Sequence, residues 1–138
     1  MLVPFSSAEK ACEAVSAVFR AGVIPSALEF MERDAIDWTL KYVDGITLDI
    51  KDEVQAHLLI EVDGNDVDVL FKDCECISEV MEAHDCGEIL FADSQAQKDQ
   101  LWMMRRRVGE AVKANSIYKE EDTVVPRYAL PKLLKGVK

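Results

Sequence analysis

Glycine is scarce in this chain of 138 residues. The six glycines are scattered, and none of them forms a Gly-x-Gly-x-x-Gly, Walker or Gly-x-Ser-x-Gly motif. Such motifs bring backbone N–H groups around a phosphate or beside a reacting carbonyl. The strand–helix–strand units are also too short for half of a dinucleotide-binding fold. The sequence therefore lacks a visible phosphate cradle.

Basic residues are too few to balance the acidic ones. Sixteen Lys and Arg residues stand against 26 Asp and Glu, which gives a net charge of -10. Nucleic acids and anionic membrane surfaces are bound by basic faces, so both partners are disfavoured. No apolar run approaches the roughly 20 residues of a membrane helix. The first residues also lack the pattern of a signal peptide. We expect a cytoplasmic protein with no nucleic-acid or membrane partner.

Residues that commonly bind metals are few and badly spaced. Cys74 and Cys76 fall in a helical pattern, where residues two apart point about 200° away from each other. His84 and Cys86 are close in sequence but belong to no paired ligand motif. We predict no metal site and reduced thiols. His57 lies on the opposite side of its strand from Leu58, so we expect a surface or hydrogen-bonded histidine without a catalytic role.

Strand and helix patterns alternate along the chain. Apolar periodicity predicts strands over 2–5, 27–31, 57–62, 88–92 and 123–126, and helices beginning near 8, 34, 67, 95 and 130. Ser6 and Glu9 have the spacing of a capping box, and so do Ser94 and Gln97. Asp34 is a candidate helix cap, and Gly22 has the position of a helix C-terminus. The order predicts an α+β fold, the ferredoxin-like split βαβ antiparallel sheet with helices packed on one face. We expect one domain, 1–138, shortened at both ends.

Three consecutive arginines, Arg105 to Arg107, lie in the stretch 100–112. Its apolar residues form one helical stripe, and Arg105 lies at the edge of that stripe, roughly 40° from Leu101. Gly109, one turn later, leaves space beside it. A guanidinium placed there could bind a carboxylate through two hydrogen bonds. The commoner arrangement is an arginine whose stem covers the core while its head stays in water. Spacing alone leaves both interpretations open.

Four landmarks resemble a known family. The stretch 21–33, Ala-Gly-Val-Ile-Pro-Ser-Ala-Leu-Glu-Phe-Met-Glu-Arg, is similar to the gly-ile-x-pro-x-ala-leu-glu-leu-met-asp-arg signature of FAD-linked oxidases. This family includes the glycolate oxidase D subunit, D-lactate dehydrogenases and D-2-hydroxyglutarate dehydrogenases. The stretches 59–64, 101–105 and 121–127 match its next landmarks in the same order.

The resemblance implies the C-terminal substrate domain, or cap domain, of a flavin-dependent 2-hydroxy-acid oxidoreductase. By motif position, Arg105 and Lys119 correspond to residues that bind the substrate in relatives. Some relatives have a substrate-binding threonine where Gly109 stands, so that contact is missing here. The resemblance assigns no catalytic residue to this chain.

The family's other landmarks do not occur within these 138 residues. Both the FAD-binding domain and a later histidine-rich motif are missing. FAD is therefore expected in the full-length enzyme and not on this chain, which should be inactive alone. The expected partners are a small 2-hydroxy acid, the missing FAD-binding domain and a second copy in a homodimer. The alternative is a free-standing ferredoxin-like module that binds a small molecule or assembles without catalysis.

Overall fold

A three-stranded antiparallel sheet forms the centre of the computed structural model, which describes residues 1–137. The strands are β1 (Leu2–Phe5), β2 (Ala27–Glu32) and β3 (Ala56–Glu61), in the order β1-β3-β2. β3 is therefore the middle strand. The confirmed fold class is α+β with an antiparallel sheet.

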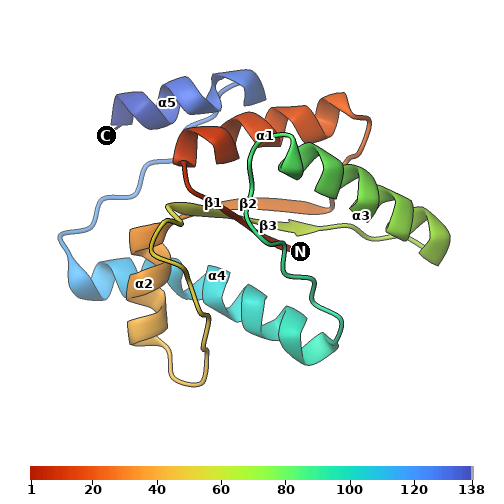
Figure 1. Cartoon of the computed structure of the whole chain (residues 1–138). Helices are drawn as coiled ribbons and strands as arrows, with labels where there is room; N and C mark the ends of the chain where they lie inside the picture. The colour runs from red at the N-terminus through yellow and green to blue at the C-terminus, as the bar shows by residue number, and fades with distance from the viewer. Residues whose placement is uncertain (138) are drawn as a thin grey trace.

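Helices cover both faces of the sheet (Figure 1). α1 (Ala8–Arg20) and α3 (Val67–Glu82) lie on one face, as expected for the split βαβ arrangement. The second face is not open, because α2 (Arg33–Tyr42) and α4 (Gln95–Asn115) cover it. A short 3-10 helix, Arg127–Ala129, leads into α5 (Leu130–Val137), which packs outside α1. No helix within residues 1–137 is both long and apolar enough to cross a membrane.

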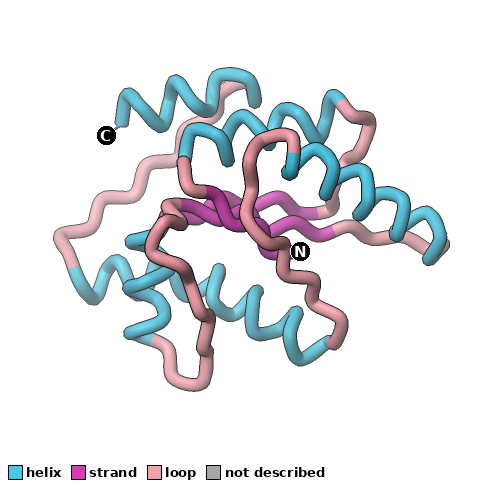
Figure 2. The backbone as a smooth tube through the Cα atoms, in the orientation of Figure 1, coloured by secondary structure: helices cyan, strands magenta, loops and turns pink. Residues whose placement is uncertain are grey.

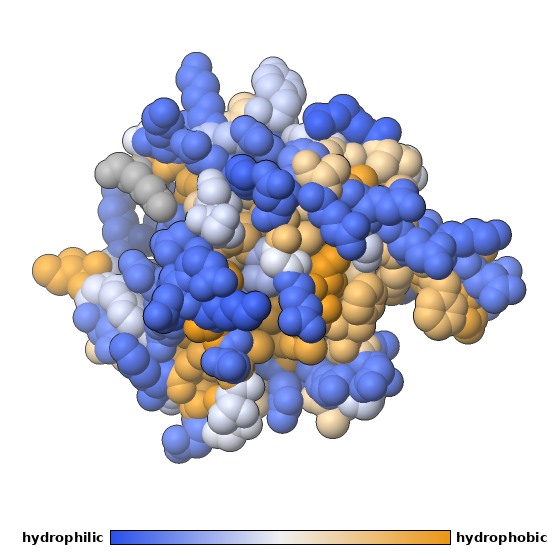
Figure 3. Space-filling model, in the orientation of Figure 1, coloured by the Kyte–Doolittle hydropathy of each residue, from blue (hydrophilic) through white to orange (hydrophobic). Residues whose placement is uncertain are grey.

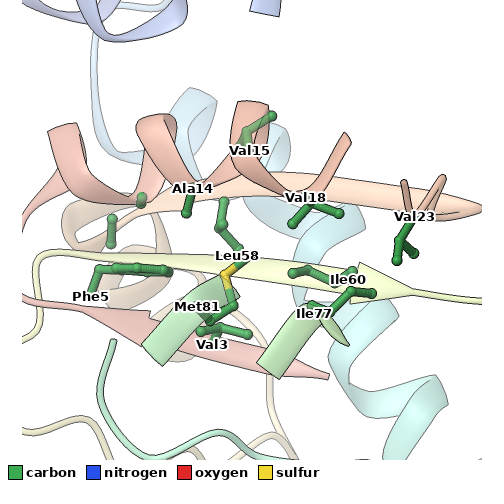
Figure 4. Close-up of a cluster of buried hydrophobic side chains, with 12 residues drawn as sticks. Val3, Phe5, Ala14, Val15, Val18, Val23, Leu58, Ile60, Ile77 and Met81 are labelled. Carbon is green, nitrogen blue, oxygen red and sulfur yellow. The ribbon is translucent and has the colours of Figure 1, made fainter. Parts of the chain in front are cut away.

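Two hydrophobic cores follow from the alternation of side chains along β3. Leu58 and Ile60 point toward α1 and α3, where they meet Ile77 and Met81 (Figure 4). Leu59 points the other way, into a second core. That core also contains Leu2, Met31, Ile36, Leu101 and Met104. Because both faces of β3 are buried, its sequence is almost continuously apolar, which suits a central strand.

The helices begin and end close to the positions predicted from the sequence, but two of the predicted capping residues are wrong. Ser7, not Ser6, caps α1, because its extended backbone lets the hydroxyl accept from the Lys10 N–H. Gly22 follows α1 with a φ of +92°, a conformation that glycine adopts without a Cβ clash. Glu32, not Asp34, precedes α2, and Asp34 lies in its first turn.

The strand expected over 88–92 is not formed. The segment contacts the outer edge of β1 through two isolated bridges, Leu2 with Leu90 and Phe5 with Cys86. Gly87 donates to the Pro4 carbonyl at 2.8 Å, but Pro4 has no N–H to return a hydrogen bond. The two bridges also differ in register by one residue, so no continuous ladder forms. Within residues 1–137 the sheet therefore has three strands and not the four expected for the ferredoxin-like arrangement.

The strand expected over 123–126 is also not formed. Residues 117–126 run as an irregular connection between α4 and the 3-10 helix (Figure 2). Val124, in the middle of the expected strand, is 93% exposed. Within residues 1–137 this segment pairs with no strand of the sheet.

Candidate functional site

The basic helix α4 crosses the second face of the sheet. Ser94 accepts a hydrogen bond from the Gln97 N–H, which starts the helix as its sequence predicts. Leu101, Met104 and Ala111 are buried along one stripe. This stripe fixes the rotation of the helix, so Arg105 lies beside the sheet edge.

Arg105 is bound by a carboxylate from β2. Its Nε donates to Oε2 of Glu29 at 2.9 Å, and its Nη2 lies 2.8 Å from the same oxygen. The side chains are 37% and 34% exposed, so the pair is half-buried. The head of Arg105 is thus not simply left in water. Glu29 was not predicted as a site residue from the sequence, although it lies within the 21–33 landmark and on the same strand face as Met31.

A second carboxylate holds α4 one turn earlier. Trp102 donates its indole Nε1–H to Oε2 of Glu61, at the end of β3, over 2.5 Å. Ala27 is the cross-strand partner of Glu61, so Glu29, two residues further along β2, lies on the same face of the sheet. The two carboxylates therefore bind residues three apart on one helix, and their alternation along the strands was the signal available in the sequence.

The neighbouring arginines have other partners. The guanidinium of Arg106 lies 5.6 Å from the ring centroid of Trp102, and Arg107 pairs with Glu110 within the same helix. Both arginines are exposed. Arg105 is therefore the member of this basic run that contacts the sheet. A Cβ added at Gly109 would meet nothing within 4 Å, so the space expected beside Arg105 exists.

Lys119 lies in the connection after α4 and is 83% exposed. Its ammonium pairs with Glu121, two residues away. Nearby, the Lys113 ammonium lies 4.6 Å from the ring centroid of Tyr118. Within the described residues, Arg105 and Lys119 make no contact with each other. Their convergence on one substrate carboxylate stays a prediction.

Two of the pockets among the described residues lie elsewhere, and neither cation lines them. One, of about 240 Å³, is lined mainly by apolar residues of β3, α3 and α4, with Glu61 and Lys98. Apolar side chains also show on the surface at the projecting end of α3 (Figure 3), where Phe71 is 66% exposed. The other, of about 460 Å³, lies between the segments 48–54 and 85–90. Its charged lining residues are Lys51, Asp49, Glu53, Asp85 and Glu88.

Neither pocket fits the pyrophosphate of FAD. Phosphate groups are bound by N–H groups at helix starts and by Lys or Arg. The larger pocket presents four carboxylates and one lysine, and the smaller pairs one lysine with one carboxylate in an apolar lining. No group of three His, Cys, Asp or Glu residues suited to a metal occurs within residues 1–137.

His57 forms part of the wall of the larger pocket but is itself 4% exposed. Burial lowers its pKa to about 4, and the charge of Arg33 acts in the same direction. Its Nδ1 has no hydrogen-bond partner. The expectation of a surface or hydrogen-bonded histidine is therefore wrong. Met31 opposes it on β2, and β3 is enclosed on both faces.

The chain belongs to a known family. Residues 1–138 match the family described as FAD linked oxidases, C-terminal domain. The resemblance found in the four landmarks is thereby confirmed.

Curated relatives come from the same class. The chain is 31% identical over 139 residues to glycolate oxidase subunit GlcD of Escherichia coli (strain K12), covering 99% of the chain and 27% of the relative. It is 31% identical over 143 residues to D-lactate dehydrogenase of Anaerostipes hadrus, covering 100% and 30%. A Mycobacterium tuberculosis FAD-linked oxidoreductase is 30% identical over 138 residues, with 97% and 30% covered. The chain thus spans less than a third of each relative.

Proposed function

We propose that this chain is the substrate-binding cap domain of a flavin-dependent 2-hydroxy-acid oxidoreductase of the glycolate oxidase type. Family membership supports the flavoprotein class, and two relatives are named for 2-hydroxy acids, glycolate and D-lactate. The observation that carries the proposal is the half-buried guanidinium of Arg105, which has a fixed orientation and donors to spare.

The proposed ligand is the carboxylate of a small 2-hydroxy acid. Arg105 carries five N–H donors in a planar fork. Glu29 contacts Nε and Nη2 through a single oxygen, so the edge formed by Nη1 and Nη2 keeps donors for a second carboxylate. Lys119, on the segment that leaves the same helix, supplies a second positive charge after moving from Glu121. The open space at Gly109 leaves room for the acid.

The chemistry belongs to the complete flavoprotein. A bound flavin would accept the electrons of the oxidation, while residues of this chain bind and orient the acid. We infer that this chain is inactive alone, since neither the 240 Å³ pocket nor the 460 Å³ pocket offers the cationic lining that FAD requires. A ferredoxin-like core, as the resemblance implies, would present α4 to the flavin-binding domain.

Anaerobic reduction tests this function in the flavoprotein that joins this domain to a flavin-binding domain. Glycolate and D-lactate are added separately, and loss of the visible absorbance of oxidised flavin is followed. Reduction by either acid, weakened in Arg105→Ala, is the expected result. A flavin that no small 2-hydroxy acid reduces would favour the alternative of a binding or assembly module.

A further inference from the structure

Glu29 and Arg105 bring together two landmarks that lie 76 positions apart in the chain. The carboxylate belongs to β2, whose backbone is held by β3, and its cross-strand neighbour is Leu59. The guanidinium belongs to α4, whose buried stripe packs against the same face. Both partners therefore stand on rigid elements, which suits a site that needs a fixed orientation.

The contact uses only part of the guanidinium. Both of its short distances, 2.9 Å from Nε and 2.8 Å from Nη2, end at one oxygen of Glu29. Glu29 thus engages the side edge of the fork. The end edge, formed by Nη1 and Nη2, has no other partner among the described residues. A carboxylate can bind there while Glu29 keeps its place.

The helix is restrained against rotation near this point. Trp102 is bound to Glu61 one turn before Arg105, from the same face of the sheet. Met104, which lies between these two residues in the sequence, is fully buried. With the helix fixed, the remaining freedom of Arg105 is the rotation of its own side chain, and this is the freedom that Glu29 restricts.

We propose that Glu29 is a positioning residue, which holds the guanidinium of Arg105 by its side edge so that the end edge faces the carboxylate of the 2-hydroxy acid. The proposal rests on the proposed function and adds a residue to it. Glu29 does not touch the acid. It lowers the cost of ordering a long side chain at the moment of binding, because the side chain is already ordered.

Glu29 could instead compete with the substrate, and this role predicts a different result. If Glu29 occupied the place of the substrate carboxylate, it would compete with the acid for Arg105. Removing its charge would then tighten binding. Under the positioning role, removing the charge weakens binding, so the two roles predict opposite signs for one measurement.

The test uses a graded series in the flavoprotein. Glu29→Gln keeps the shape and one acceptor oxygen, while Glu29→Ala removes the contact. We expect KM for glycolate or D-lactate to rise about tenfold in Glu29→Ala, since misplacing a binding group has a cost of this order or more. Glu29→Gln should fall between Glu29→Ala and the unchanged protein, and kcat should change less than KM.

Glu110→Gln is the matched control, because it removes the carboxylate partner of an exposed arginine on the same helix. It should leave KM unchanged. Melting temperatures of all variants show whether a change in KM comes from partial unfolding. If Glu29→Ala is unstable, Glu29→Gln still tests the proposal. An unchanged or lowered KM in both Glu29 variants would overturn the proposal.

A double mutant separates this proposal from the proposed function. In an Arg105→Ala background, Glu29→Gln should add no further rise in KM, since Glu29 acts through Arg105. If Arg105→Ala leaves KM unchanged, the substrate role of Arg105 fails, and Glu29 has nothing to position. If Arg105→Ala raises KM and the Glu29 variants do not, the positioning role alone fails.

Discussion

Trp102 and Glu61 are joined by a hydrogen bond between the indole N–H and the carboxylate at the end of β3. The pair ties the third family landmark to the second, as Arg105 and Glu29 tie the third to the first. The first three of the four landmarks are therefore neighbours in space. Together, the two contacts hold α4 across the sheet and place Arg105 at the sheet edge.

Replacement of Arg105 tests the substrate site directly. In the flavoprotein, Arg105→Ala should cost roughly 2–4 kcal/mol in kcat/KM, as loss of a charged hydrogen-bonding partner usually does. Arg107→Ala should change little, because Arg107 is paired with Glu110 on the exposed side of α4. Equal small losses in both variants would indicate that Arg105 is an ordinary surface residue.

Replacing a glycine by alanine can stabilise or destabilise the fold, depending on the backbone conformation and on the space around the added Cβ. Gly109→Ala should stabilise α4 by about 1 kcal/mol, because an added Cβ meets open space and alanine favours a helix. Gly22→Ala should destabilise by about 1 kcal/mol, because Gly22 has a φ of +92°. Melting temperatures should shift in opposite directions, by roughly 3 °C. A shift of the same sign in both would contradict this account.

Acid should weaken the fold through His57. Its pKa is about 4 in the folded chain, well below the ordinary 6.5, so the unfolded chain binds the proton more readily. The stability from this group is complete above pH 6.5 and falls as the pH drops toward 4. At pH 5 the loss is about 2 kcal/mol.

Urea denaturation at pH 7 and pH 5 measures this loss. His57→Gln should reduce the difference in unfolding free energy between the two pH values. His84→Gln is the control, since the His84 Nδ1 lies 2.8 Å from the Val80 carbonyl at the end of α3. An unchanged difference in His57→Gln would show that other groups set the acid sensitivity.

The purified chain should be colourless. Its sequence has no phosphate-binding glycine motif, and neither the 240 Å³ pocket nor the 460 Å³ pocket has the lining that FAD requires. Gel filtration after incubation with FAD, followed by a visible absorption spectrum, measures retention. Stoichiometric flavin that survives the column would refute the expectation.

We expect the chain to form a homodimer. Val67, Val69 and Phe71 expose apolar surface on α3, and the outer edge of β2 has no neighbouring strand within residues 1–137. Light scattering should show a dimer that Phe71→Asp weakens if the α3 surface is used. A dimer unaffected by this change would point to the β2 edge, and a monomer at high concentration would contradict the prediction.

The sequence predicted features that depend on local patterns. Ser94, Gly22 and the alternation along β3 produce the expected cap, turn and central strand because each acts on residues close by. The predicted strand over 88–92 does not form, because Pro4 of β1 has no N–H to donate to it. This could not be predicted without knowing that the segment lies beside Pro4. Glu29 was missed as the partner of Arg105 because the two residues lie 76 positions apart in the sequence, and no local pattern shows that they are close in space.

The strand order has a consequence for how quickly the chain folds. β1 and β2 both pair with β3 and not with each other, so neither has a partner until β3 arrives. Each pairing must therefore close a long loop, and such non-local contacts slow folding. The β2–β3 pair encloses the shorter loop and should form first, leaving β1 as the last strand to join.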